Sequence, residues 1–302
     1  MRNVAEKRLL SAAPPLSRRV AAGVATRGRP DHISRVVALL RRQTLRPAVI
    51  LVAYVERADV AGLAEAPDLA LIACAPGLTR QRNAILDALP RDAEFVAFFD
   101  DDFWPHPQWL QRAVAAFDAD PALAGLTGHV LANGVCGGEI APSLAREILA
   151  RADPAAHEGV EQDVSPYGCN MAFRRAAVGA LRFDERLVLY GWLEDRDFAA
   201  RVARGGGRLA RVGAALGVHL GVGAGRMSDR GLGYAQIANP LYLLRRRNMS
   251  AADFARRVGC DLASNLAKAP RSAARRRRLV GHLLALAEAR VGRSAPVRAA
   301  RF

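Results

Sequence analysis

Three consecutive aspartates, Asp100 to Asp102, directly follow the apolar run Phe95–Phe99. The length and continuity of this run are typical of a strand buried on both faces of a sheet. Adjacent carboxylates repel one another, so a fold that places them at a strand end normally supplies a cation. Oxygen ligands suit a hard ion such as Mg²⁺ or Mn²⁺. The stretch therefore predicts a metal site, with a solvated acidic turn before a helix near Pro107 as the alternative.

Apolar runs alternate with helical patterns through the first third of the chain. We expect strands at Val20–Ala25, Ala48–Tyr54, Leu69–Cys74 and Phe95–Phe99, and helices from Pro30 to Gln43 and from Arg80 to Leu89. This order predicts an α/β fold with a doubly wound, mostly parallel sheet and helices on both faces. Ligands bind such sheets outside the carboxyl ends of the strands, where the loops Thr26–Arg29, Tyr54–Asp59 and Asp100–Asp102 fall.

The remaining two thirds of the chain carry shorter and weaker patterns. We expect helices at Pro107–Phe117 and Glu194–Ala203, strands at Leu123–Leu131, Gly168–Phe173 and Leu209–Val212, and an apolar run at Leu216–Leu220. Residues 133–165 are rich in Gly, Pro and Ala, and we expect them to form a variable connecting segment, an excursion from the sheet that passes over the site. We accordingly place a basic N-terminal segment at residues 1–19, a catalytic domain at 20–224 and a basic helical extension at 225–302.

Composition narrows the class of protein. Hydrophobic residues make up 51% and charged residues 24% of the 302 positions, which is ordinary for a globular protein. No apolar run approaches the roughly 20 residues of a membrane span, and the basic start is a poor secretory signal. The four cysteines form no CxxC pair, which argues against a zinc site or a disulfide framework. We expect a reducing, cytoplasmic setting.

The net charge of +15 is concentrated at the ends of the chain. Residues 245–302 contain 15 Lys and Arg against three Asp and Glu, whereas the middle of the chain is near neutral. Such asymmetry indicates an anionic partner, either membrane or nucleic acid, or a solvated tail. Within Arg271–Arg293 a stripe of Leu279, Leu283, Leu286 and Val291 predicts a basic amphipathic helix. It could lie on the inner face of the plasma membrane or pack on the catalytic domain.

Five segments, in order from Val20 to His219, resemble family 2 glycosyltransferases of the GT-A fold. They read TRGRPDHISRVVALLRRQT, GLTRQRNAIL, FFDDDFWP, GCNMAFRRAAV and FDERLVLYGWLEDRDFAARVARGG. The resemblance implies transfer of a sugar from a nucleotide-sugar donor to an acceptor hydroxyl, usually with inversion at the anomeric carbon. It further implies a metal-dependent, hexosyltransferase-like enzyme of surface polysaccharide or glycolipid synthesis, with a saccharide or lipid-linked saccharide as acceptor.

The resemblance also implies roles for particular residues around the donor. Asp102 is the expected direct ligand of Mn²⁺ or Mg²⁺, with Asp100 beside it and His219 as a further ligand. Donor-binding residues are expected at Thr26, Arg27, Glu56, Arg82, Asn83, Asp100, Asp101, Asn170 and Trp192. Asp101 could instead point inward to hold the turn. The segment AYVERAD departs from the family pattern, so either Glu56 or Asp59 could take the place of the acid that contacts the base.

The acidic pair Glu194 and Asp195 matches the segment that carries the family's catalytic base. The resemblance implies that Asp195 is the base, that Glu194 places the acceptor and that Trp192 offers an aromatic face to a sugar. The alternative is structural, since acidic residues at a helix N-terminus are favoured by the helix dipole. For Arg82 the alternatives are a contact to phosphate or base, and an exposed position on a helix.

Three other functions remain as alternatives. A nucleotidyltransferase would need a glycine-rich phosphate loop after the first strand, and ATRGRP is not one; neither GxGxxG nor GxxxxGK[ST] occurs there. A nucleic-acid-binding module would interleave basic and aromatic residues, whereas the positive charge here is terminal, so we do not expect a nucleic-acid partner. A relative that binds nucleotide sugars without transferring them is the third alternative.

Overall fold

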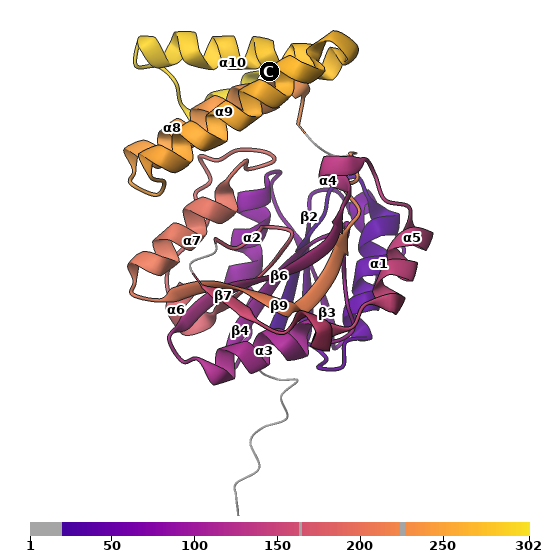
Figure 1. The fold of residues 1–302 in the computed structure, drawn as a ribbon. Helices are drawn as coiled ribbons and strands as arrows, with labels where there is room; N and C mark the ends of the chain where they lie inside the picture. Colours follow the sequence, from indigo (N-terminus) through magenta and orange to yellow (C-terminus); the bar gives the residue numbers. More distant parts are fainter. Residues whose placement is uncertain (1–19, 163–164, 224–226) are drawn as a thin grey trace, which may run out of the picture.

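A nine-stranded sheet forms the centre of the computed structural model, which describes residues 20–162, 165–223 and 227–302 (Figure 1). The strand order is β3-β2-β1-β4-β8-β6-β9-β5, and β7 pairs with β9. The strands are β1 (Val20–Ala25), β2 (Val49–Tyr54), β3 (Leu69–Ala73), β4 (Phe95–Asp100), β5 (Phe103–Pro105), β6 (Leu123–Asn133), β7 (Val160–Gln162), β8 (Asn170–Arg174) and β9 (Arg208–His219). The basic segment expected at residues 1–19 lies outside the described residues.

Most strands run in one direction, as the alternating pattern predicts. Strands β1, β2, β3, β4, β6 and β9 are mutually parallel, while β5, β7 and β8 run against them. The predicted α/β fold with a mostly parallel sheet is therefore confirmed. The antiparallel β8 enters between β4 and β6, so the acidic loop after β4 lies next to the loop that leads into β8.

Helices cover both faces of the sheet. One face carries α1 (Pro30–Arg41), α3 (Trp109–Ala119) and α5 (Pro142–Arg151), and the other carries α2 (Leu78–Asp87), α6 (Arg175–Val178) and α7 (Glu194–Arg204). Strand β4 contributes Phe95 and Phe99 to the first core and Phe98 to the second. Its alternate side chains are thus buried on opposite faces, which is the reason for its unbroken apolar run.

Two expectations about connecting segments are changed. The predicted strand Leu209–Val212 and the run Leu216–Leu220 belong largely to one long strand, β9, which pairs with β6 through a register shift between Gly128 and His129. The excursion expected over the site contains α4 (Gly134–Gly137), α5, the 3-10 helix η3 (Pro154–His157) and β7. Because α5 buries Ala145 in the core it shares with α1, most of this excursion packs beside the sheet.

The C-terminal residues form a helical unit at the top of Figure 1. It consists of α8 (Asp229–Arg245), α9 (Ala251–Lys268) and α10 (Ala273–Arg290), with the 3-10 helices η4 (Ala269–Arg271) and η5 (Pro296–Arg301). Helices α8 and α10 approach closely where each has a glycine. A Cβ on Gly233 would lie 2.1 Å from the carbonyl oxygen of Arg278, so only glycine permits this crossing. The helical character of the extension is confirmed, whereas the boundary near residue 224 stays a prediction.

Helix α10 turns its predicted apolar stripe outward. The buried side of the helix is formed by Gly281, His282 and Ala285, whereas Leu283 is 68% exposed and Leu286 is 43% exposed. The stripe therefore does not pack on the catalytic domain in this structure. None of the helices in the described part of the chain combines the length and the apolar character that crossing a bilayer requires.

Candidate active site

The acidic loop after β4 is surrounded by cations. Asp101 is fully buried, accepts a hydrogen bond from Thr26 Oγ1 at 2.8 Å and lies 3.1 Å from Arg29 Nη2. Burial raises the pKa of Asp101 to about 7, against the lowering effect of Arg29. Asp101 therefore points inward and joins the loops after β1 and β4, which is the second of the two roles expected for it.

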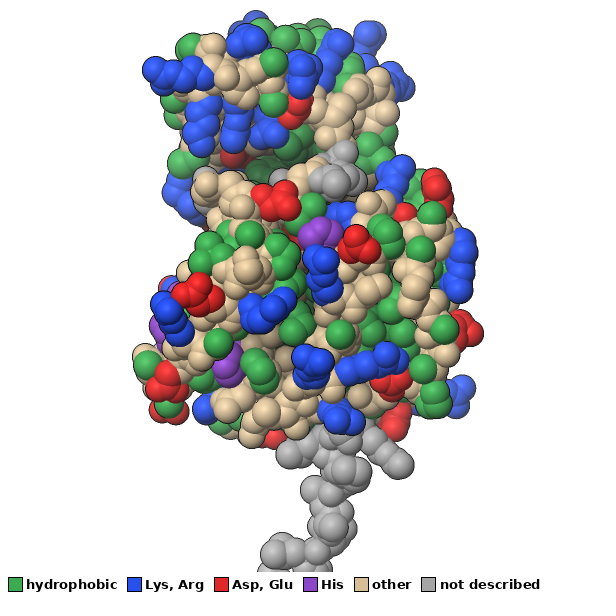
Figure 2. Space-filling view, turned by 90° about the vertical axis from the view of Figure 1, so that its right-hand side faces the viewer, with side chains coloured by type: hydrophobic (Ala, Val, Ile, Leu, Met, Phe, Trp, Pro, Cys, Tyr) green, Lys and Arg blue, Asp and Glu red, His purple; other side chains and the backbone are tan. Residues whose placement is uncertain are grey.

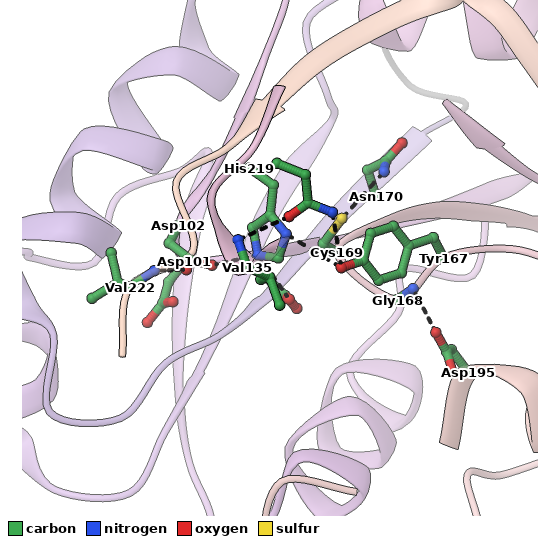
Figure 3. Close-up of polar contacts among 12 residues, drawn as sticks. Asp101, Asp102, Val135, Tyr167, Gly168, Cys169, Asn170, Asp195, His219 and Val222 are labelled. Atoms are coloured by element: carbon green, nitrogen blue, oxygen red, sulfur yellow. Dashed lines mark hydrogen bonds and ion pairs between the residues drawn. The ribbon is translucent and has the colours of Figure 1, made fainter. Parts of the chain in front are cut away.

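Asp102 is also buried, and its two oxygens have different partners (Figure 3). Oδ1 lies 3.2 Å from His219 Nε2, while Oδ2 accepts the Val222 N–H at 2.8 Å and lies 3.4 Å from Arg29 Nη1. Burial disfavours the charged carboxylate, but these partners hold the pKa of Asp102 at about 2. Asp102 is therefore not solvent-accessible, because Arg29 and His219 balance its charge inside the protein.

Asp100, Asp102 and His219 form a group that fits a divalent cation. One ligand atom from each lies within 4.8 Å of the others, and Asp100 keeps 28% of its side chain exposed. Two carboxylates and an imidazole are a donor set that Mn²⁺ accepts, and an open side leaves room for substrate oxygens. Although burial opposes its charge, Cys169 and Asp102 raise the pKa of His219 to about 11, so binding a metal there would displace a proton.

Arg82 is a buried ion-pair residue, so the alternative of an exposed position on a helix is wrong for it. Its guanidinium pairs with Glu194 Oε1 and lies 3.2 Å from Asp100 Oδ1. The rings of Phe98 and Phe183 flank it at 5.9 and 5.6 Å. Asp100, Asp102 and His219 are called the metal-competent group below. Arg82 thus links this group to the acidic residues that begin α7, and carboxyl groups of the protein already neutralise the charge of its guanidinium.

Gly168 connects the same two regions through its backbone (Figure 3). Its carbonyl accepts a hydrogen bond from Arg82 Nη2 at 2.7 Å, and its N–H donates to Asp195 Oδ2 at 2.8 Å. A Cβ at this position would lie 3.2 Å from oxygens of both Glu194 and Asp195 and 3.3 Å from Arg82 Nη1. The side chains can close around position 168 because it is glycine.

The two acids that begin α7 have different surroundings. Glu194 is 4% exposed, and its Oε2 has no hydrogen-bond partner in the described structure. Burial raises the pKa of Glu194 to about 8, although Arg82 acts to lower it. Asp195 is partly exposed, and its Oδ1 accepts the N–H of Arg196 at 2.8 Å. The pair thus offers one buried acid and one partly exposed acid.

The turn before α7 has an unusual backbone. Leu189, Gly191 and Leu193 all have left-handed conformations, with φ of 56°, 66° and 69°. The C-terminal unit holds this turn, since Asn239 Nδ2 donates to the Trp192 carbonyl at 2.8 Å. Arg257 of α9 lies over the Trp192 ring, 4.5 Å from its centroid. The guanidinium of Arg257 therefore stacks on the Trp192 ring, which was expected to contact a sugar.

Two adjoining cavities open at this edge of the sheet. The Thr26 cavity, of about 110 Å³, is lined by the loop after β1 with Thr26 and Arg27. The Tyr167 cavity, of about 320 Å³, is lined by Tyr167 and by the acids that begin α7. Both cavities include Asp100 and Tyr190 in their walls. A ligand that extends from one cavity to the other would therefore pass the metal-competent group.

Three residues expected at the donor are placed elsewhere. The Asn83 amide bonds to Phe183 and Glu185, and the Asn170 amide bonds to Gly128 and Cys169. Neither side chain lines the Thr26 or Tyr167 cavity. Glu56 is exposed and outside both cavities.

Asp59, the alternative to Glu56, is buried and accepts backbone N–H groups of Gly28, Val55 and Glu56. It holds the loops after β1 and β2 together. Thr26, Arg27, Arg82 and Trp192 do lie at the cavities, each in the wall of one of them.

The structure adds four residues that motif reasoning did not assign: Arg29, Tyr167, Gly168 and Arg257. Arg29 shows that the protein itself places a cation beside the acidic loop. Its position directly before Pro30, in a loop at a strand's carboxyl end, is a signal that could have identified it. Arg257 could not be found this way because it comes from the distant helix α9.

Comparisons with known proteins agree with this architecture. A model of the family described as glycosyl transferase family 2 matches residues 64–181, a segment that includes Arg82 and the three aspartates. This match confirms the resemblance seen in the motifs and supports a glycosyltransferase. No curated protein matches the chain.

A solved structure of S. aureus TarS shares this fold. The fragment of residues 1–349 of TarS has a TM-score of 0.51 and 15% identity, covering 75% of this chain and 65% of that one. A longer TarS structure has a TM-score of 0.47 and 16% identity, with 75% and 40% covered. The present chain thus spans less than two thirds of either TarS chain, and the first likeness shows a shared fold.

Proposed function

Because residues 64–181 match glycosyl transferase family 2, we propose that this chain transfers a sugar from a nucleotide-sugar donor to an acceptor hydroxyl, with inversion. The observation that carries this proposal is the pair of adjoining cavities that share Asp100 and Tyr190. The metal-competent group stands at their junction, and the acids of α7 line only the Tyr167 cavity. One side suits a nucleoside diphosphate, and the other suits a nucleophile and its base.

On the donor side, the protein would hold Mn²⁺ or Mg²⁺ with Asp100, Asp102 and His219. A bound divalent ion supplies charge stabilisation for a departing diphosphate. Thr26 and Arg27 line the Thr26 cavity, where the nucleotide would lie. Arg29 occupies the oxygens of Asp101 and Asp102, so it would exchange these partners for diphosphate oxygens when donor and metal bind.

On the acceptor side, Asp195 is the better base. A base must be ionised to accept the hydroxyl proton, and it must lie within hydrogen-bond reach of that proton. The pKa of Glu194, raised to about 8 by burial, keeps this acid protonated at neutral pH. Two backbone N–H groups, from Gly168 and Arg196, orient the Asp195 carboxylate in the cavity wall. Asp195 lines the Tyr167 cavity and not the Thr26 cavity, so it would act from the acceptor side, as single displacement with inversion requires.

For the acceptor, we propose a saccharide or lipid-linked saccharide at an anionic membrane surface. The outward stripe of α10 supports this, because Leu283, Leu286 and Val291 are exposed between arginines near both ends of the helix. Basic residues near an anionic bilayer contribute roughly 1 kcal/mol each, and exposed apolar side chains add to binding. The C-terminal unit also reaches the cavities, through Met227 before α8 and Arg257 of α9, so we propose residues 225–302 as a functional part of the enzyme.

The proposal is tested by a thermal-shift panel of nucleotide sugars, each with Mn²⁺ and with EDTA. A donor at 100 times its Kd should stabilise the protein by about 2.7 kcal/mol, a readily measured rise in Tm. The stabilising compound should then be consumed, and NMR of the product should show an inverted anomeric carbon. A panel in which no nucleotide sugar raises the Tm, with or without Mn²⁺, would contradict the proposed function.

A further inference from the structure

A third cavity lies apart from the candidate active site. This Trp104 cavity, of about 700 Å³, is formed by α1, α5 and the segment from β5 to α3. Its lining residues are Arg35, Ala38, Leu39, Arg42, Trp104, Pro105, His106, Pro107, Arg146, Leu149, Ala150 and Ala152. None of them lines the Thr26 or Tyr167 cavity. The volume falls within the roughly 300–1,000 Å³ typical of small-molecule sites.

The walls of the Trp104 cavity are mainly apolar. Helix α1 contributes Ala38 and Leu39, α5 contributes Leu149, and Trp104 and Pro105 come from β5. Arg35 and Arg42 lie one helical turn before and after these α1 positions, on the same face of the helix. The residues that α1 buries in the core, Ile33, Val36, Val37 and Leu40, do not line the cavity.

The charge at the rim is entirely positive. Arg35, Arg42 and Arg146 reach the cavity from both helices, and none of them has an ion pair within the described residues. No Asp or Glu of the described chain lines the cavity, whereas the Thr26 and Tyr167 cavities both contain carboxylates. Burial lowers the pKa of His106, which favours its neutral form, so the positive charge at the rim comes from the arginines. Figure 2 views this side of the molecule and shows basic side chains among hydrophobic ones.

We propose that the Trp104 cavity binds a single-chain lipid with a phosphate headgroup. The chain would lie along Leu39, Trp104 and Leu149, where burial of its methylene groups favours binding. The phosphate would meet the arginines at the rim, whose forked N–H groups suit its oxygens. A second copy of this chain fits the rim poorly, because it would bring a further net charge of +15 to the same arginines.

Calorimetric titration of the full chain with n-dodecyl phosphate, below its micelle concentration, tests the proposal. n-Dodecylphosphocholine is the matched ligand, since it has the same chain and phosphate but no net charge. We expect dodecyl phosphate to bind at least about tenfold more tightly than the phosphocholine. Arg42→Ala/Arg146→Ala should lose about tenfold in affinity, and Ala38→Trp, which fills the cavity from an exposed helix position, should abolish binding.

Two control variants test whether dodecyl phosphate binds in the Trp104 cavity. Arg41→Ala removes a neighbouring arginine that pairs with Asp68 and does not line the cavity, so it should change the affinity less than twofold. Leu283→Glu changes the exposed stripe of α10 and should leave the affinity unchanged. The proposal is overturned if wild-type protein does not bind dodecyl phosphate or does not distinguish the two ligands. It is equally overturned if Ala38→Trp binds normally, if the double variant matches Arg41→Ala, or if Leu283→Glu abolishes binding.

Discussion

Arg82 and Asp195 hold the two backbone polar groups of one residue, Gly168. Arg82 Nη2 donates to the carbonyl at 2.7 Å, and Asp195 Oδ2 accepts the N–H at 2.8 Å. Arg82 also pairs with Asp100 and Glu194. The metal-competent group and the proposed base are therefore connected through a single buried guanidinium and a single glycine.

Gly168→Ala should impair transfer with little effect on folding. The new Cβ would lie 3.2–3.3 Å from atoms of Asp195, Glu194 and Arg82, so these side chains must shift by a few tenths of an ångström. Misplacement of this kind costs up to about 100-fold in rate. Turnover and urea unfolding should be measured together. The control is Gly259→Ala, where a Cβ meets nothing within 4 Å. Equal turnover of the two variants would show that the close packing of these side chains around position 168 does not affect transfer.

Asp195→Asn should reduce transfer by at least about 100-fold while donor affinity changes little, because it removes the proton acceptor. Glu194→Gln should act through the acceptor and through Arg82, whose buried contact with this side chain it alters. Glu147→Gln, on exposed α5, is the neutral control. If Asp195→Asn retains turnover while Glu194→Gln abolishes it, the two roles are exchanged; if both remain active, the base lies elsewhere.

Asp100→Asn should weaken binding of nucleoside diphosphate in Mn²⁺ without unfolding the protein, since this carboxylate is partly exposed. Asp102→Asn is a less clean test because it takes the charged partner from buried His219 and one of two carboxylates from Arg29, and breaking a buried ion pair costs about 3–5 kcal/mol. Calorimetry in Mn²⁺ and in EDTA measures the effect. The same diphosphate affinity in both conditions, for wild-type protein, would rule out a metal role.

The stability of the ligand-free protein should fall with pH because of Glu194. Burial raises its pKa from 4.5 to about 8 in the folded state, so the folded protein keeps a proton that the unfolded chain releases. The contribution is fully present below pH 4.5 and is lost as pH rises towards about 8. Glu194→Gln lacks this titration, so the difference in unfolding free energy between the two proteins should change across that window. A pH-independent difference would show that Glu194 titrates normally.

Leu283→Glu/Leu286→Glu should reduce sedimentation with anionic liposomes. Both side chains are exposed, so the variant should fold, but two carboxylates would disrupt the apolar stripe between the arginines of α10. The charge-matched control is Ala252→Glu/Ala263→Glu on exposed positions of α9. Higher salt should weaken binding of the wild-type protein. Equal sedimentation of both double variants and the wild type would contradict a membrane role for this stripe.

The local sequence pattern was sufficient to predict the secondary-structure elements and the edge of the sheet at which the site lies. The apolar run Phe95–Phe99 alone indicated a strand buried on both faces, and the aspartates after it indicated the ligand-binding edge of the sheet. The acids before Phe198 indicated where a helix begins, because acidic side chains favour a helix N-terminus. These features depend on neighbours within a few residues, so the sequence by itself determined them.

The partners of the charged groups were decided only by the tertiary structure. Arg82 and Glu194 are 112 residues apart in the chain, and they meet because β8 enters the sheet beside β4. The same packing brings Arg29 to Asp101, and it turns Asn83 towards Phe183 instead of a ligand. Helix α10 shows the converse case: its leucine periodicity was visible in sequence, but the glycine crossing with α8 determined which side is buried. Periodicity specifies an element, whereas the choice of partner for a charge or an apolar face depends on which elements the sheet order places together.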